Sequence, residues 1–188
     1  METIIYFVRH ADSPYVEGQE RSRGLSDIGM KDALTVRNIL MFEDIDVFYS
    51  SPYERAISTI RPTANHYGMD VLVVEDLRER MIGDFTPNSF WDAKQQVYND
   101  YSFSFPQGES SFHAQRRAFV ALLEIIKKNN NKKIAIGTHG DIMTLMLNGF
   151  NKNIGFGFWQ STSMPDIYKV QLSGLEILNM KRLFEGWQ

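Results

Sequence analysis

The stretches Thr3-Ile-Ile-Tyr-Phe-Val8 and Lys132-Lys-Ile-Ala-Ile136 decide the fold, because each is an apolar, β-like run that ends close to a histidine. His10 follows the first run and His139 follows the second. In open α/β sheets, ligands bind in the crevice outside the carboxyl ends of the strands. Two such strands in one sheet would bring both imidazoles to one pocket, and the sequence therefore predicts an active site at that edge.

Length and composition limit the class of protein. The chain has 188 residues, of which 43% are hydrophobic, and this is enough to bury the core of one domain over residues 1–188. The net charge of −3 argues against a nucleic-acid-binding protein with a broad basic face. No apolar run approaches the roughly 18 residues of a membrane span, and the lack of cysteine fits a reducing compartment. We therefore expect a cytoplasmic protein that binds neither nucleic acid nor a membrane.

Strands and helices are expected to alternate along the chain. The predicted strands are residues 3–8, 46–50, 71–74 and 132–136, with a closing pair at 167–172 and 175–183. The predicted helices are residues 26–40, 51–67, 89–100 and 110–128, with one more after Gly140. Since the first strand is apolar throughout, it should be central and covered on both faces. The pattern predicts a three-layer α/β/α fold with a mostly parallel sheet and an antiparallel edge strand.

Some local features refine this prediction. Ser26 is expected to cap the first helix, and Ser51 to cap a second helix that has Pro52 at its first position. Residues 80–107 are aromatic, contain proline and follow no clear period. We expect them to form a small insertion over the carboxyl edge of the sheet, as a lid or substrate-binding segment.

An arginine beside a histidine at a strand end is a candidate site for phosphate chemistry. The guanidinium of Arg9 could hold two phosphoryl oxygens, and a neutral His10 imidazole could attack phosphorus to give a phosphohistidine. Arg55 follows a second strand, in a first helical turn whose free amides favour an anion. Beside His139, Gly140 lets backbone approach a ligand closely. Taken singly, Arg55 could equally be a surface residue and His139 a packed core histidine.

Six motifs follow one another along most of the chain. They are Val8-Arg-His10, Gly24-Leu-Ser-Asp-Ile-Gly29, Ser50-Ser-Pro-Tyr-Glu-Arg-Ala56, Leu77-Arg-Glu79 followed by Gly83, Pro106-Gln-Gly-Glu-Ser110, and Thr138-His-Gly140. In this order they resemble the histidine phosphatase superfamily, also called the phosphoglycerate mutase-like family. The resemblance implies that His10 is the phosphorylated nucleophile, that Arg9, Arg55 and His139 form the phosphate pocket, and that Glu79 donates a proton to the leaving oxygen.

The chemistry of these residues agrees with the implied roles. Nearby guanidinium groups should lower the pKa of His10 and keep it neutral, and burial beneath residues 80–107 should raise the pKa of Glu79. Fixed donors can supply most of the stabilisation of a phosphoryl transition state, so no metal or other cofactor is expected. Without the resemblance, Arg78-Glu-Arg80 would be interpreted as an exposed, ion-paired loop.

The chain departs from the family pattern at several positions. Ala11 replaces the usual glycine, Asp12-Ser-Pro-Tyr15 stands where mutases have an asparagine, and Gly83-Asp-Phe85 replaces an aromatic-Glu-Gly sequence. Asp141 would place a carboxylate near a substrate dianion unless it turns away to cap the next helix, which is the interpretation we favour.

Several further residues are weaker candidates for contact with the substrate. Ser13 and Arg23 are possible substrate contacts, and Arg21 with Arg23 either reaches a second anionic part of the substrate or lies in a solvated loop. His66 and His113 lie on predicted helices and are assigned no role. The segment Phe150–Trp159 is expected to be a flexible aromatic loop that borders the pocket or packs elsewhere.

The function predicted from the sequence is metal-independent hydrolysis of a small phosphorylated metabolite through a phosphohistidine. One alternative is a phosphoglycerate mutase, although mutases usually carry a longer insertion and the asparagine that this chain lacks. The other is a catalytically silent phospho-ligand-binding module, which would need neither His10 nor Glu79. The sequence leaves the physiological substrate and the oligomeric state open.

Overall fold

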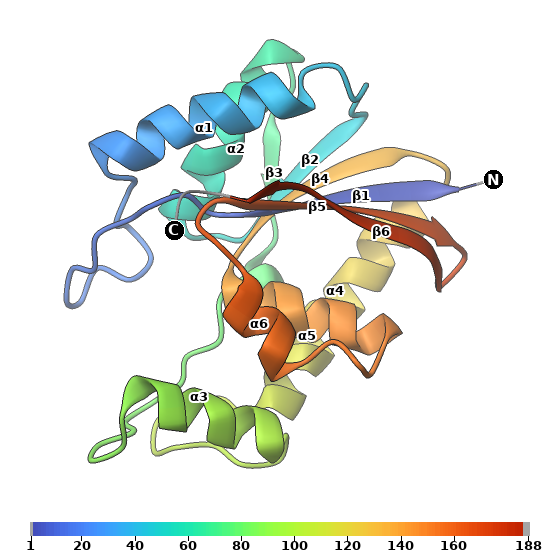
Figure 1. The fold of residues 1–188 in the computed structure, drawn as a ribbon. Coiled ribbons are helices and arrows are strands. Elements are labelled where there is room, and N and C mark those ends of the chain that lie inside the picture. The colour runs from blue at the N-terminus through green and yellow to red at the C-terminus, as the bar shows by residue number, and fades with distance from the viewer. Residues whose placement is uncertain (1, 186–188) are drawn as a thin grey trace.

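A six-stranded sheet forms the centre of the computed structural model, which describes residues 2–185 (Figure 1). The strands are β1 (Thr3–Arg9), β2 (Val47–Ser50), β3 (Val71–Val73), β4 (Lys133–Thr138), β5 (Asp166–Ser173) and β6 (Glu176–Glu185). Their order is β3-β2-β4-β1-β5-β6, and β1 to β4 run parallel. The predicted α/β fold is confirmed, and the predicted closing pair of strands forms the antiparallel edge, with β5 antiparallel to β1 and β6 antiparallel to β5.

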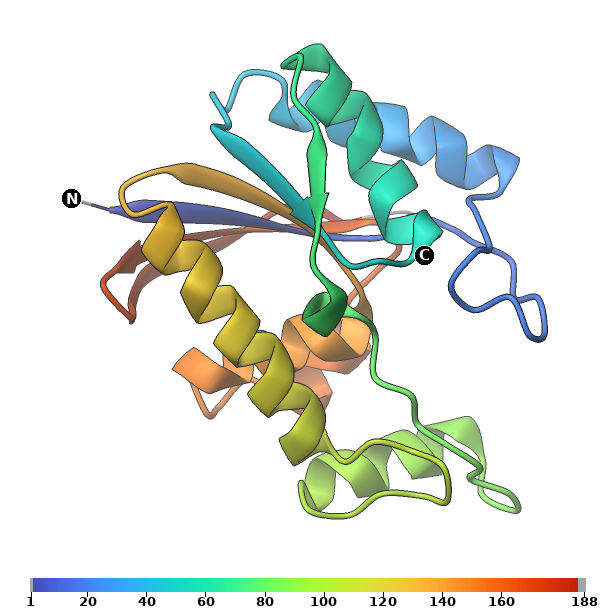
Figure 2. The ribbon, with the colours of Figure 1, turned by 180° about the vertical axis from the view of Figure 1, so that it is seen from behind.

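Helices cover both faces of the sheet. One face carries α1 (Asp27–Leu40) and α2 (Glu54–His66), and the other carries α4 (Ser111–Lys128), α5 (Gly140–Phe150) and α6 (Phe156–Ser161) (Figures 1 and 2). A short 3-10 turn, Glu75–Leu77, follows β3, and α3 (Phe90–Asn99) lies farther out, beyond the second helical layer. These three layers explain why a long apolar strand can sit in the middle of the sheet.

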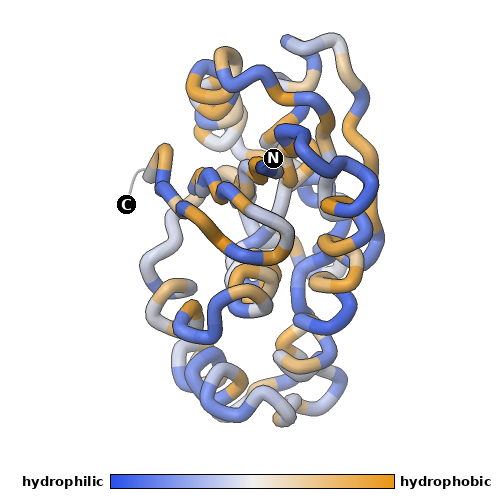
Figure 3. The backbone as a smooth tube through the Cα atoms, turned by 90° about the vertical axis from the view of Figure 1, so that its right-hand side faces the viewer, coloured by the Kyte–Doolittle hydropathy of each residue, from blue (hydrophilic) through white to orange (hydrophobic). Residues whose placement is uncertain are grey.

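The first strand is buried from both sides. Ile5 and Phe7 pack into the core beneath α4 and α5, while Tyr6 and Val8 pack into the core beneath α1 and α2. All four residues are fully buried, which explains why the sequence does not alternate here. Along the helices, by contrast, hydrophobic and hydrophilic residues alternate in bands (Figure 3).

The two predicted helix caps differ in outcome. Ser26 caps α1, since its hydroxyl accepts the amide of Gly29 at 3.0 Å. The prediction that Ser51 caps α2 is wrong, because α2 starts only at Glu54 and its N-cap residue, Tyr53, makes no side-chain cap. The Ser51 hydroxyl contacts His139 at the site described below.

The segment after residue 80 contains the helix α3 between two stretches that form neither helix nor strand. Phe90 and Trp91 of α3 pack against Trp159, with ring centroids 6.1 and 5.4 Å apart. Trp159 belongs to α6, so the prediction of a flexible loop over Phe150–Trp159 is wrong from Phe156 onward, while residues 151–155 form no helix. The helix α6 is stabilised because Trp159 is buried and stacks on Phe156. That residues 80–107 act as a lid remains a prediction.

The length and hydrophobicity of the helices decide whether any of them could span a membrane. Within residues 2–185, none of the helices combines the length and the apolar character that crossing a membrane demands.

The buried centre of β1 should dominate stability. Replacing Phe7, which is fully buried, by alanine is expected to lower the free energy of unfolding by about 3–5 kcal/mol, because a large cavity remains. Urea denaturation of Phe7→Ala measures this. Phe42 is 80% exposed, and Phe42→Ala is the matched control that should change little. Equal losses in both variants would contradict this account of the core.

Candidate active site

The pairing of β1 with β4 brings the two strand-end histidines together. Arg9 lies opposite Thr138 in the parallel register, so the residues that follow, His10 and His139, leave the sheet side by side. Their ring centroids are 5.2 Å apart. The neighbouring strand β2 leads into Arg55 at the start of α2, whose guanidinium contributes to the electrostatic field at His10.

His10 is held with one ring nitrogen available. The ring is only 7% exposed, and Nδ1 lies 2.7 Å from the carbonyl oxygen of Ala11. Since a carbonyl can only accept, Nδ1 donates, and in the neutral ring the lone pair is on Nε2. Burial lowers the pKa of His10 well below its usual value, and the charges of Arg55, Arg9 and Arg23 lower it further. His10 can therefore act as a neutral nucleophile.

His139 is fully buried beside it. Its Nε2 lies 2.6 Å from the hydroxyl of Ser51, and that hydroxyl accepts the backbone amide of Tyr53 at 3.2 Å. A Ser51 hydroxyl that donates to Nε2 leaves the proton of a neutral His139 on Nδ1. Burial lowers the pKa of His139 well below its usual value, and His10 and Arg55 lower it further. This ring can thus offer an N–H without carrying a charge.

Among residues 2–185, three buried nitrogens on the neighbours of His10 have no hydrogen-bond partner. The Nη1 of Arg9 donates to the carbonyl and hydroxyl of Thr162, at 3.0 and 2.6 Å. The Nη atoms of Arg55 donate to the carbonyl and carboxylate of Glu20, at 2.7 and 2.6 Å. Within residues 2–185, however, no group accepts from Nε of either arginine or pairs with Nδ1 of His139. Because buried donors are normally satisfied, this arrangement points to a bound anion.

Glu79 occupies the start of α5. Its carboxylate accepts the backbone amides of Ile142 at 2.9 Å, Arg80 at 2.9 Å and Asp141 at 3.2 Å. Burial raises the pKa of Glu79, and the Asp141 charge raises it further, against the opposing effects of Lys94 and these amides. Such a carboxyl keeps its proton to a higher pH than an exposed glutamate, as a proton donor requires.

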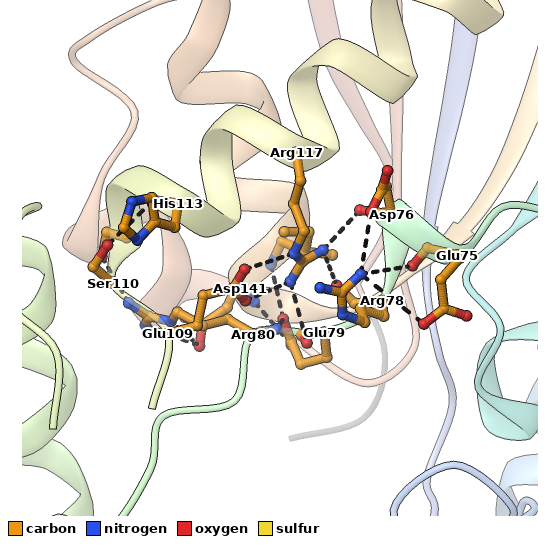
Figure 4. A network of polar contacts seen from close by, with 12 residues as sticks. Glu75, Asp76, Arg78, Glu79, Arg80, Glu109, Ser110, His113, Arg117 and Asp141 are labelled. Atoms are coloured by element: carbon orange, nitrogen blue, oxygen red, sulfur yellow. Dashed lines mark hydrogen bonds and ion pairs between the residues drawn. The ribbon is translucent and has the colours of Figure 1, made fainter. Parts of the chain in front are cut away.

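Arg117 of α4 fixes the segment that carries Glu79 (Figure 4). Its guanidinium donates to the carbonyls of Asp76 and Arg78, at 2.7 and 2.9 Å, and to both carboxylate oxygens of Glu109 at 2.7 Å. Sequence reasoning missed Arg117. The signal that could have found it is Glu109, an acidic residue in the Pro106–Ser110 motif that pairs with Arg117.

The prediction that Asp141 caps α5 is wrong. Asp141 is buried, and its carboxylate pairs with Arg80 at 3.0 Å and with Lys94, and accepts the hydroxyl of Tyr98 at 3.0 Å. Burial raises its pKa, but the cations of Lys94 and Arg80 lower it more, so the group stays ionised. The cap is unnecessary because Glu79 already accepts the first amides of α5.

The weaker candidates lie in the loop after β1. The Ser13 hydroxyl donates to the carbonyl of Gly24 at 2.7 Å and accepts from Arg23 at 2.7 Å, so its hydrogen bonds stabilise the loop. Arg23 lies close enough to lower the pKa of His10. Arg21 is paired with Glu75 on the surface.

Of the remaining predicted residues, Gly140 lies beside Arg9, whereas His66 and His113 are exposed. A Cβ atom on Gly140 would lie 3.0–3.2 Å from the guanidinium atoms of Arg9, so this glycine makes room for the arginine. His66 and His113 are exposed on helices, away from the other two histidines in the sequence. Within residues 2–185, no three His, Asp or Glu side chains cluster in a way that could hold a metal ion.

The chain belongs to the histidine phosphatase superfamily (branch 1), whose family model matches residues 5–187. A protein of Hydrogenobacter thermophilus with the provisional name phosphoserine phosphatase 2 is 29% identical over 148 residues, 72% of each chain. The metal-independent phosphoserine phosphatase of Arabidopsis thaliana is 24% identical, over 98% of this chain and 81% of that protein.

Solved structures show the same fold. The mycobacterial glucosyl-3-phosphoglycerate phosphatase superposes with a TM-score of 0.75 at 17% identity, over 97% of both chains. A phosphoserine phosphatase variant from Entamoeba histolytica, solved with phosphoserine, gives 0.77 at 18% identity, over 95% of this chain and 96% of that one. Together with the family match, the phosphatase relatives make this chain a phosphatase, a hydrolase of phosphoric monoesters.

The Glu20 carboxylate should compete with phosphate for Arg55. Glu20→Gln is expected to tighten the binding of inorganic phosphate by up to about fivefold, because a half-exposed ion pair contributes about 1 kcal/mol or less. Isothermal titration calorimetry measures the affinity. The control is Glu54→Gln, which removes a surface pair with Arg61 and should leave phosphate binding unchanged. Unchanged or weaker binding in Glu20→Gln would refute the competition.

Proposed function

We propose that this phosphatase hydrolyses small phosphomonoesters through a phosphohistidine on His10, without a metal ion. The observation that carries the proposal is the group of three unpaired buried nitrogens around a neutral histidine, His10, whose Nε2 has no hydrogen bond within residues 2–185. These nitrogens, from Arg9, Arg55 and His139, would hold the phosphoryl oxygens.

The first step transfers the phosphoryl group to the enzyme. Nε2 of His10 uses its lone pair to form a bond to phosphorus, while the bond between phosphorus and the ester oxygen breaks. The leaving oxygen takes the proton of Glu79 and departs as an alcohol. The guanidinium groups and the N–H of His139 neutralise the charge that spreads over the phosphoryl oxygens, and so fulfil the electrostatic role that a metal would otherwise have.

The second step releases phosphate. The Glu79 carboxylate, now without its proton, accepts a proton from water as the water oxygen attacks phosphorus. The bond between phosphorus and Nε2 breaks, and inorganic phosphate and a neutral His10 remain. The burial that lowers the pKa of His10 makes the free imidazole its favoured form after this step.

The substrate class follows from the relatives. Two are named as phosphoserine phosphatases, and the Entamoeba structure holds phosphoserine. Small phosphorylated metabolites of this kind are therefore the substrates that we propose. A silent binding module has no use for Glu79 or for a nucleophile with a low pKa, and this argues for the enzyme.

His10 should be indispensable. His10→Ala is expected to abolish turnover, and acid-labile, base-stable phosphate should appear on wild-type protein quenched during hydrolysis of an aryl phosphate. His66→Ala, at an exposed histidine, is the control and should keep wild-type activity. Wild-type turnover in His10→Ala would exclude the phosphohistidine, and a loss of activity on adding a chelator would exclude the metal-free mechanism. Transfer between phosphoglycerates would instead indicate a mutase.

The role of Glu79 as proton donor should make the effect of its replacement depend on the leaving group of the substrate. Glu79→Gln is expected to lower kcat/KM for an alkyl phosphate by about 10²- to 10⁴-fold, and for dinitrophenyl phosphate much less, because dinitrophenolate leaves without a proton and kcat/KM does not include the later attack of water. Glu75→Gln, at an exposed residue four positions away, is the control. Equal losses on both substrates would contradict the role of Glu79.

The pH profile should reflect the same two groups. Activity needs neutral His10, whose pKa lies well below its usual 6.5, so kcat/KM should fall only as pH drops through that lower value. It also needs protonated Glu79, whose pKa lies above its usual 4.5, so kcat/KM for an alkyl phosphate should fall as pH rises through it. The alkaline fall should disappear in Glu79→Gln. Its persistence there would assign it to another group.

A further inference from the structure

A cavity of about 690 Å³ lies beside the candidate active site and shares Arg9 with it. Its wall includes Asp32 of α1, Phe90 and Trp91 of α3, and the segment 159–164. The reaction steps above use none of these side chains except Arg9. The cavity is large enough for the alcohol part of a small phosphomonoester.

In the described part of the chain, Asp32 has no partner. It is 6% exposed, and within residues 2–185 it makes no hydrogen bond or ion pair. Asp12 also lines the cavity, and its carboxylate accepts the Ser26 hydroxyl at 2.5 Å. Burial raises the pKa of Asp32 and the nearby charge of Asp12 raises it further, and no cation among residues 2–185 offsets these effects. Because Asp32 lines the cavity, a cationic ligand there would supply the positive charge that its carboxylate lacks.

Aromatic rings form another part of the wall. Phe90 and Trp91 expose 45% and 57% of their surface, although both are large and hydrophobic. Trp159 packs edge-on against Trp91, with ring centroids 5.4 Å apart. Aromatic faces attract organic cations, and Lys94 already lies 5.2 and 5.3 Å from the rings of Phe90 and Trp159. A metal ion would instead require several oxygen ligands, so this wall favours an organic cation.

We propose that the Asp32 cavity binds an ammonium group on the alcohol part of the substrate. The inference rests on the proposed function, because the phosphoryl group must lie at His10 for the alcohol to extend past Arg9. Asp32, aided by Asp12, supplies the negative charge, and Trp91 supplies an aromatic face. The substrates are thus phosphomonoesters of amino alcohols or amino acids, in which the cation and the phosphate belong to one molecule.

The test compares two substrates of the same shape. Phosphocholine carries a trimethylammonium group, and 3,3-dimethylbutyl phosphate carries an uncharged tert-butyl group in its place. The wild-type kcat/KM should favour phosphocholine by about tenfold. Asp32→Asn should reduce this ratio to near one, and Trp91→Leu should reduce it in part. Asp27→Asn removes an exposed carboxylate of the same helix and should leave the ratio unchanged.

The outcomes separate the inference from the proposed function. Turnover of both esters at equal kcat/KM would overturn the ammonium site alone. If no phosphomonoester is hydrolysed, the proposed function fails, and the site is then tested by the quenching of tryptophan fluorescence with choline. Choline should quench the wild type and Asp27→Asn, but not Asp32→Asn. Quenching that persists in Asp32→Asn, or that Mg²⁺ produces and choline does not, would overturn the ammonium site.

Discussion

The parallel pairing of β1 with β4 is the constraint on which the site depends. The register is fixed by residues such as Phe7 and Ile136, which are fully buried. A slip by one residue would turn the buried side chains to the opposite face of the sheet, so the cores on both faces oppose it. The same register decides that His10 and His139 leave the sheet together. Packing energy far from the reacting atoms therefore maintains their separation of 5.2 Å.

The site combines buried cations with histidines that remain neutral. Arg55 is only 2% exposed, and Arg9 and Arg55 both have an Nε without a partner in the described part of the chain. This arrangement is unfavourable for the empty protein, because desolvated guanidinium groups lack full compensation. A bound dianion, as we propose, would make it favourable. Glu20 relieves part of the cost at Arg55, and as the carboxylate of a surface loop it can withdraw without disturbing the core.

Much of the fold was predictable because it follows from local sequence. Apolar runs marked the strands, Ser26 marked the start of α1, and the position of His10 and His139 after strands indicated a shared pocket. What the sequence concealed depends on contacts between distant segments. From the sequence alone, Ser51 has the features of a helix cap. In the structure its hydroxyl instead contacts His139, which is 88 positions away. Asp141 likewise has the features of a cap, but the carboxylate of Glu79 accepts the first amides of α5 instead. The role of Arg117 depends on the packing of α4 against the 76–79 segment, which the sequence does not show.

The ion pair of Lys94 with Asp141 has a consequence for motion. Lys94 belongs to α3 and Asp141 to α5, and both are buried. If α3 swung outward, Lys94 would leave Asp141, and a buried carboxylate would lose one of its two cationic partners. The ion pair with Asp141 therefore opposes outward movement of α3, and we expect ligands to enter past the loop after β1, where Arg21 and Glu75 form an exposed ion pair.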